Sequence, residues 1–172
     1  ANREAGFAKA LELLGDRLDI IVNAAGVQRR YPSEEFPMKD WNFVMDINLN
    51  AVFALCQLAG RQMLKQGSGK IINIASMLSF FGGYTVPAYA ASKGGVMQLT
   101  KALSNEWASK GININAIAPG YMATEMNTAI LADEGRNSEI TARIPAHRWG
   151  TPKDMQGPLL FLASSASDYL NG

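Results

Sequence analysis

Three short runs of β-branched residues alternate with longer helical segments, and this alternation restricts the possible fold more than any other feature. The runs are residues 18–22, 70–75 and 112–118. The helical segments are residues 2–14, 40–66 and 88–110, each followed at once by a glycine. Apolar strands separated by long helices are typical of a parallel sheet with helices on both faces. We therefore predict an α/β fold.

The polar residues that follow these runs indicate where a ligand would bind. Asn23, Ser76 and Pro119 each stand at or just after the carboxyl end of a predicted strand. Ligands of parallel sheets bind at this edge. Residues 31–39 should form a loop, 123–143 two short helices over the site, and Thr151 or Pro152 should open a last helix through about Ala163.

Ser76, Tyr89 and Lys93 form a candidate proton-transfer site. Tyr89 and Lys93 are four residues apart, so they share one face of a helix. A phenol has a pKa near 10, and a nearby ammonium favours the phenolate and should lower that pKa toward the working range. The hydroxyl of Ser76 could hold the oxygen of an alcohol or ketone beside the phenol. This chemistry suits the interconversion of alcohols and ketones. Taken singly, Tyr89 and Lys93 could also be an ordinary aromatic and a solvated lysine.

Four motifs in this order resemble the short-chain dehydrogenase/reductase family. They are Ser76 with Tyr89-x-x-x-Lys93, Asn23-Ala24-Ala25-Gly26, Asn48 within Ile-Asn-Leu, and Pro119-Gly120 followed by Met122 and Thr124. Ala24 departs mildly from the Asn-Asn-Ala-Gly pattern of the family. The resemblance implies a Rossmann-like parallel sheet and an NAD(P)-dependent oxidoreductase acting on a secondary alcohol or ketone, with NAD as the expected cofactor and NADP left open.

The resemblance also implies roles for individual residues. Ser76 would orient the substrate oxygen, Tyr89 would transfer its proton, and Lys93 would stabilise the phenolate and bind the nicotinamide ribose. Asn48 would hold a relay water at a point where its helix is disturbed; the alternative is an amide bonded to its own helix. The cofactor would contact Asn23, Ala24, Ala25, Gly26, Tyr89, Lys93, Pro119, Gly120, Met122 and Thr124. Asn23 could equally satisfy groups between strands, and Pro119-Gly120 could be a plain turn.

Further stretches resemble the branch of the family that acts on sugar acids. They are residues 71–80, 118–124 and 143–150. A carboxylate substrate would give a function to Arg29 and Arg30, because a guanidinium binds a carboxylate through two parallel hydrogen bonds. The expected substrate contacts are therefore Ser76, Tyr89, Arg29 and Arg30. The alternative for the two arginines is a solvated pair.

Composition narrows the choice of partners and compartment. The chain has 172 residues, about the size of one domain, and a formal net charge of +1. Without a basic run, nucleic acid and anionic membranes are poor partners. One cysteine, Cys56, and one histidine give no metal-ligand spacing, so we expect no metal. We find no apolar run of about 18 residues and no secretion signal, which makes a cytoplasmic protein the expectation.

The glycine-rich turn that holds the cofactor pyrophosphate in this family does not occur in residues 1–172. The resemblance implies that the first three strands and the last strand of the family sheet lie outside the chain. We therefore expect a single partial domain, an exposed sheet edge, weak dinucleotide binding and doubtful activity of the isolated chain. The alternative function is an inactive fragment that keeps the helical association surface through which family members form homodimers or homotetramers.

Overall fold

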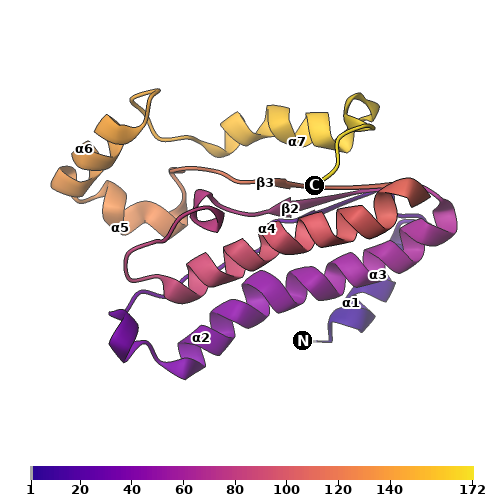
Figure 1. Cartoon of the computed structure of the whole chain (residues 1–172), viewed down its shortest axis with the longest axis horizontal. Helices are drawn as coiled ribbons and strands as arrows, with labels where there is room; N and C mark the ends of the chain where they lie inside the picture. Colours follow the sequence, from indigo (N-terminus) through magenta and orange to yellow (C-terminus); the bar gives the residue numbers. More distant parts are fainter. Residues whose placement is uncertain (1) are drawn as a thin grey trace.

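The computed structural model describes residues 2–172, and its centre is a parallel three-stranded sheet in the order β1-β2-β3. The strands are β1 (Ile20–Asn23), β2 (Gly69–Ile74) and β3 (Ile112–Ile117). Residues Asn23 and Asn73 are partners in register, as are Ile74 and Ile117, so the carboxyl ends of the strands meet at one edge. The predicted α/β fold is confirmed (Figure 1).

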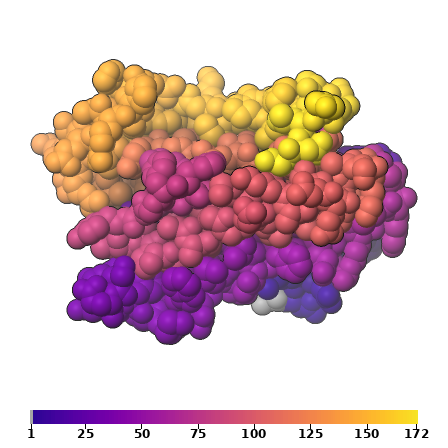
Figure 2. Space-filling model, in the orientation of Figure 1, coloured from indigo at the N-terminus to yellow at the C-terminus, as the bar shows by residue number. Residues whose placement is uncertain are grey.

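Helices cover both faces of the sheet. The first face carries α1 (Arg3–Leu13), α2 (Met38–Met45), α3 (Ala51–Gln66) and α4 (Pro87–Trp107). The other face carries α7 (Gln156–Ala163), while α5 (Thr128–Leu131) and α6 (Glu134–Arg143) lie beyond the carboxyl ends. In the space-filling view, the purple residues of α2 and α3 lie on one side of α4 and the orange and yellow residues of the last third on the other (Figure 2).

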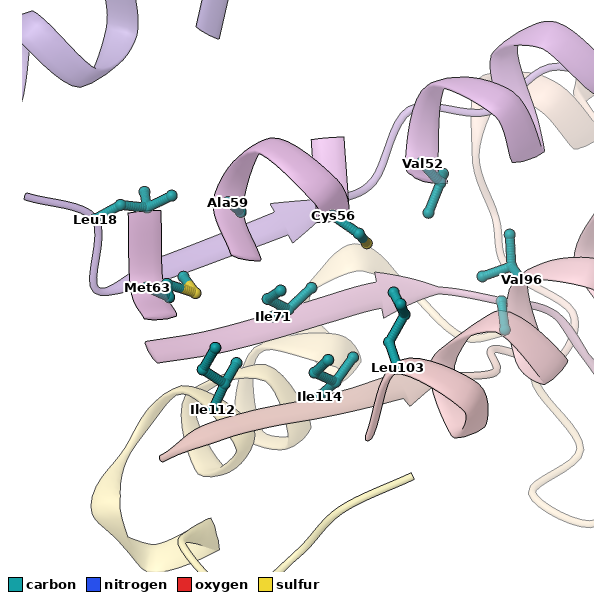
Figure 3. Close-up of a cluster of buried hydrophobic side chains, with 11 residues drawn as sticks. Leu18, Val52, Cys56, Ala59, Met63, Ile71, Val96, Leu103, Ile112 and Ile114 are labelled. Carbon is teal, nitrogen blue, oxygen red and sulfur yellow. The ribbon is translucent and has the colours of Figure 1, made fainter. Parts of the chain in front are cut away.

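The main core lies between the sheet and the first helical layer. Its fully buried members include Cys56, Met63, Ile71, Ile112 and Ile114, which converge from α3, β2 and β3 (Figure 3). Burying aliphatic side chains of this size contributes about 2 kcal/mol each. Burial raises the pKa of the Cys56 thiol to about 11.

The expected helix over residues 40–66 begins earlier and is interrupted. It starts at Met38 after Pro37, so Asp40 lies in its first turn and does not cap it. Residues Asp46–Asn50 form one π-helical turn between α2 and α3. The helix ends where Gly67 adopts a left-handed conformation with φ 71°, which glycine allows without steric cost.

The expectation that no segment is long and apolar enough to cross a membrane is wrong. The continuous helix Met38–Gln66 has both the length and the mean hydropathy that a membrane-spanning helix needs. One third of its most apolar window is buried within the protein. Val52, Cys56 and Met63 of this helix belong to the core, which explains the apolar sequence by packing against the sheet.

The two edges of the sheet differ. Within residues 2–172, β1 pairs only with β2, and its side chains Ile20 and Val22 are 44% and 38% exposed. The expected exposed edge is therefore confirmed. At the opposite edge, the backbone N–H of Gly172 donates to the carbonyl of Ile114 at 2.9 Å, so the last residues run beside β3.

Candidate functional site

Ser76, Tyr89 and Lys93 line one cavity of about 410 Å³ at the carboxyl ends of the strands. Ser76 follows β2 in an extended conformation and caps a short turn, accepting a hydrogen bond from the N–H of Leu78. Tyr89 and Lys93 come from the first turns of α4, which Pro87 opens. The Nζ atom of Lys93 lies 5.8 Å from the centroid of the Tyr89 ring. The predicted shared helical face is confirmed.

The short turn after Ser76 is fastened to α4 by Ser79. Its hydroxyl accepts from the N–H of Ser76 at 3.2 Å and donates to the carbonyl of Lys93 at 2.7 Å. Its bonds show that it couples the end of β2 to α4 and so fixes Ser76 relative to Lys93.

The predicted net lowering of the Tyr89 pKa is wrong for this structure. Burial raises the pKa of Tyr89, and the hydroxyl of Ser76 opposes this by a smaller amount. Burial also lowers the pKa of Lys93 from 10.5 to about 8. The ammonium donates to the carbonyl of Ile74 at 2.6 Å, and the residue as a whole is 3% exposed. Loss of hydration disfavours the charged form of both groups, so both are driven toward neutrality.

Asn48 occupies the middle of the π-helical turn and is fully buried. Its amide nitrogen donates to the carbonyl of Val27 at 2.8 Å and to Ser92 Oγ at 3.1 Å, and its amide oxygen accepts from the N–H of Val27 at 2.8 Å. The expected disturbance of the helix is confirmed. The alternative of an amide bonded to its own helix is wrong, because these partners lie on the loop after β1 and on α4.

Ser92 and Gly26 lie next to Asn48 and Lys93 in this part of the site. Ser92 is buried, accepts a hydrogen bond from the Asn48 amide and donates one to the carbonyl of Tyr89. A Cβ atom on Gly26 would lie 3.6 Å from Lys93 Nζ and 3.7 Å from Asn48 Oδ1. A longer side chain there would compete for the space beside the ammonium.

The expected cofactor residues divide into two groups. Ala24, Gly26, Pro119, Gly120, Met122 and Thr124 line the same cavity as Ser76, Tyr89 and Lys93, whereas Asn48 does not line it. Asn23 and Ala25 do not line it either. Asn23 is buried and donates to Asn73 Oδ1 at 2.9 Å, and Asn73 in turn donates to Thr100. Asn23 therefore joins β1 to β2 and, through Asn73, to α4.

The cavity wall also contains residues that the sequence did not single out. They are mostly apolar and include Ile74, Ile117, Met126, Met155 and Leu159. Met155 and Leu159 belong to the last helical segment, whose start is capped by Thr151 and Asp154. The prediction that Thr151 or Pro152 opens this segment is confirmed. From the sequence alone, an apolar residue in such a segment cannot be assigned to a cavity wall rather than to the hydrophobic core.

Arg29 and Arg30 point to different places. The Arg29 guanidinium lies over the Phe43 ring at 4.7 Å, with its Nε 3.8 Å from Asp40, and lines neither of the two cavities at this edge. Arg30 lines a second cavity of about 470 Å³, which adjoins the first at Ser76 and Tyr89. Substrate contact by Arg30 stays a prediction that the geometry of this cavity supports. For Arg29 the structure offers no such support, since its guanidinium is directed at Phe43 and Asp40.

Comparison with known proteins supports one family for the whole chain. A family model described as Enoyl-(Acyl carrier protein) reductase matches residues 1–172. The 2-dehydro-3-deoxy-D-gluconate 5-dehydrogenases of Dickeya dadantii (strain 3937) and Bacillus subtilis (strain 168) are 58% and 57% identical over 91% and 98% of this chain. The chain spans 62% and 67% of the length of these two curated relatives.

One solved structure has a fold similar to that of this chain. It is a gluconate 5-dehydrogenase from Burkholderia cenocepacia J2315 in complex with NADP and tartrate. The sequences are 43% identical, the TM-score is 0.90, and the match covers 95% of this chain and 65% of the other. The present sheet and its helices therefore correspond to part of the fold of that protein.

Proposed function

This chain belongs to the short-chain dehydrogenase/reductase family, and on that premise we propose that the protein containing it is an NAD(P)-dependent oxidoreductase that interconverts a secondary alcohol and a ketone. The observation that carries the proposal is the meeting of Ser76, Tyr89 and Lys93 around one cavity at the carboxyl edge of the sheet. A hydroxyl, a phenol and an ammonium in one partly enclosed space are the groups that proton transfer to a carbonyl oxygen requires.

The protonation state of Tyr89 suits the reduction of a ketone. Because burial raises the pKa of Tyr89, its phenol holds its proton at neutral pH. It can give that proton to a ketone oxygen held beside the Ser76 hydroxyl. The phenolate that forms is then stabilised by the Lys93 ammonium on the same face of α4. Asn48 keeps its π-helical turn against α4 through Ser92, next to Lys93, and in this proposal it positions a water for returning the proton.

The residues around the cavity suit the nicotinamide end of a dinucleotide. Gly26 and Gly120 leave room for a flat ring, and the apolar wall excludes water from one side of it. When bound, the reduced cofactor would supply the hydride that reaches the carbonyl carbon. Residues 1–172 contain no glycine-rich turn for the pyrophosphate. We therefore propose NAD or NADP as the cofactor, with weak binding by this chain alone.

A sugar acid is the substrate class that we propose, and a cytoplasmic location accompanies it. Support comes from the names of the relatives, which are gluconate and deoxygluconate enzymes, and from the tartrate bound to the Burkholderia structure. Within the present chain, Arg30 stands in the cavity that adjoins Ser76 and Tyr89.

The decisive experiment compares wild type with Tyr89→Phe, using the complete reading frame that contains this sequence. The substrates are a 5-keto sugar acid with NADH or NADPH, followed at 340 nm. We expect a loss of at least about 10²-fold in kcat, because the phenyl ring has no proton to give, with an unchanged circular dichroism spectrum. Retention of wild-type turnover by Tyr89→Phe would refute the assignment. In parallel, an NADH fluorescence titration of residues 1–172 should show no micromolar binding.

A second candidate is an association module without activity, since the Met38–Gln66 helix exposes apolar side chains. Phe43, Phe53 and Leu64 are 40%, 45% and 38% exposed. Such a surface fits a second copy of the chain in a homodimer or homotetramer. Sedimentation velocity with and without NAD, beside the turnover assay, separates the two proposals. A stable dimer with no turnover in the complete reading frame supports the module, whereas turnover supports the enzyme.

A further inference from the structure

The 3₁₀ turn Met77–Ser79, here named the junction turn, connects residues from three walls of the first cavity. The turn follows Ser76 directly, and its first N–H donates to the carbonyl of Pro119 at 3.1 Å. At its other end, the hydroxyl of Ser79 donates to the carbonyl of Lys93 at 2.7 Å. Ser76, Pro119 and Lys93 all line the cavity of about 410 Å³. The junction turn therefore links the residue after β2 to the loop after β3 and to α4.

Ser79 holds Ser76 through its side chain and its backbone. The one hydrogen of the Ser79 hydroxyl goes to Lys93, which leaves a lone pair for the N–H of Ser76 at 3.2 Å. The backbone N–H of Ser79 donates to the carbonyl of Ser76 at 2.9 Å. Both backbone groups of Ser76 are thus bonded to one residue, and that residue is itself fixed to α4.

The junction turn also directs the hydroxyl of Ser76. The oxygen of this hydroxyl accepts from the N–H of Leu78, the middle residue of the turn, at 3.2 Å. A hydroxyl has one hydrogen and two lone pairs, so the bond from Leu78 leaves the hydrogen and one lone pair for a ligand. Ser76 lines both cavities at this edge of the sheet. If the turn loosened, the Leu78 N–H would move and the hydroxyl would rotate away from a substrate oxygen.

We propose that Ser79 is a positioning residue that acts on the reaction through Ser76, by fixing the backbone and the hydroxyl direction of that residue. Ser79 lines neither cavity at this edge, so it contacts no group that reacts. Its contribution should appear in kcat, because a misplacement of about 1 Å at a reacting group can cost about 10²-fold in rate. The inference rests on the proposed oxidoreductase activity and identifies what keeps its substrate-orienting serine in place.

The first test is a double-mutant cycle in the complete reading frame, with Ser79→Ala, Ser76→Ala and the variant that carries both. With a 5-keto sugar acid and NADH or NADPH, Ser79→Ala should lower kcat about tenfold and leave KM nearly unchanged. Because Ser79 acts through Ser76, the double variant should be no slower than Ser76→Ala alone. Losses that multiply in the double variant would overturn the proposal, as would wild-type kcat in Ser79→Ala.

Two further variants separate the hydroxyl of Ser79 from a general effect of substitution. Ser79→Thr keeps the hydroxyl and should recover most of the rate that Ser79→Ala loses. Ser164→Ala is the matched control, because Ser164 also donates to a backbone carbonyl, that of Phe161, but lines neither cavity. It should turn over like wild type. A rate as low in Ser79→Thr or in Ser164→Ala as in Ser79→Ala would contradict the assigned role.

Amide hydrogen exchange, followed by NMR, provides a readout that does not depend on turnover. Exchange at Ser76 and Leu78 should accelerate at least about tenfold in Ser79→Ala, whereas the buried Ile72 of β2 should exchange as in wild type. Unchanged exchange at Ser76 and Leu78, or equal acceleration at all three amides, would overturn the positioning role. If Ser79→Ala fails to fold by circular dichroism, Ser79→Cys replaces it, since a thiol is a weak donor and acceptor. The expected exchange pattern in a protein without any turnover would refute the oxidoreductase proposal and still support the fixation of Ser76 by Ser79.

Discussion

Replacing Lys93 by methionine should stabilise the protein while removing its activity. Residue Lys93 is 3% exposed, and burial lowers the pKa of its ammonium from 10.5 to about 8. That fall corresponds to about 3 kcal/mol of folding free energy, at about 1.4 kcal/mol for each tenfold change in proton affinity. Methionine has a similar length and no charge, but it leaves the Ile74 carbonyl without its donor, which costs about 1–2 kcal/mol. The net gain near neutral pH is therefore about 1–2 kcal/mol.

The pH dependence has a definite sign. Because the pKa is lower in the folded state, the unfolded chain binds the proton more tightly, and the charge opposes folding fully below about pH 8. This cost fades as the pH rises from about 8 to about 10.5. At about pH 9.5 the wild type should have regained about 2 kcal/mol, whereas Lys93→Met gains nothing from this group. The advantage of the variant should therefore vanish at alkaline pH.

Urea unfolding followed by tryptophan fluorescence at about pH 7 and pH 9.5 measures both quantities. Lys101→Met, an exposed position on the same helix, is the matched control for removing a lysine without removing a buried charge. Turnover of Lys93→Met should fall at least about 10²-fold, since the phenolate loses its counter-charge. A stability difference between wild type and Lys93→Met that stays constant across this pH range would refute the desolvated ammonium and the reasoning built on it.

Two further substitutions test the framework of the site. Asn48→Ala removes three hydrogen bonds to Val27 and Ser92 and should lower the free energy of unfolding by about 2–4 kcal/mol, together with turnover; urea midpoints equal to wild type would contradict this. Gly111→Ala places a methyl group against the Gly67 carbonyl at φ 83°, whereas Gly67→Ala, at φ 71°, meets open space. Thermal unfolding should show a cost of about 1 kcal/mol for Gly67→Ala and at least about twice that for Gly111→Ala, and equal costs would contradict the close approach.

The comparison of Arg29 with Arg30 shows that the sequence pattern does not predict where each of two adjacent side chains is directed. Both residues follow the same turn after β1, and the sequence offers no reason to separate them. In the structure Arg29 packs on Phe43 and Arg30 lines a cavity with Arg136. Arg136 itself has no motif around it. Its position depends on how α6 folds back over the carboxyl edge, which no local pattern encodes.

The sequence alone determined the strands, the ends of most helices and the shared helical face of Tyr89 and Lys93, because periodicity, glycine termini and i, i+4 spacing act within a few residues. That Ser76 lies beside them depends on how the end of β2 packs against α4. The tertiary structure decided the protonation of the site. Solvent exclusion by segments distant in the sequence raises the pKa of Tyr89 and lowers that of Lys93. Desolvation depends on every atom packed around a group, so the direction of each pKa change follows from the assembled fold.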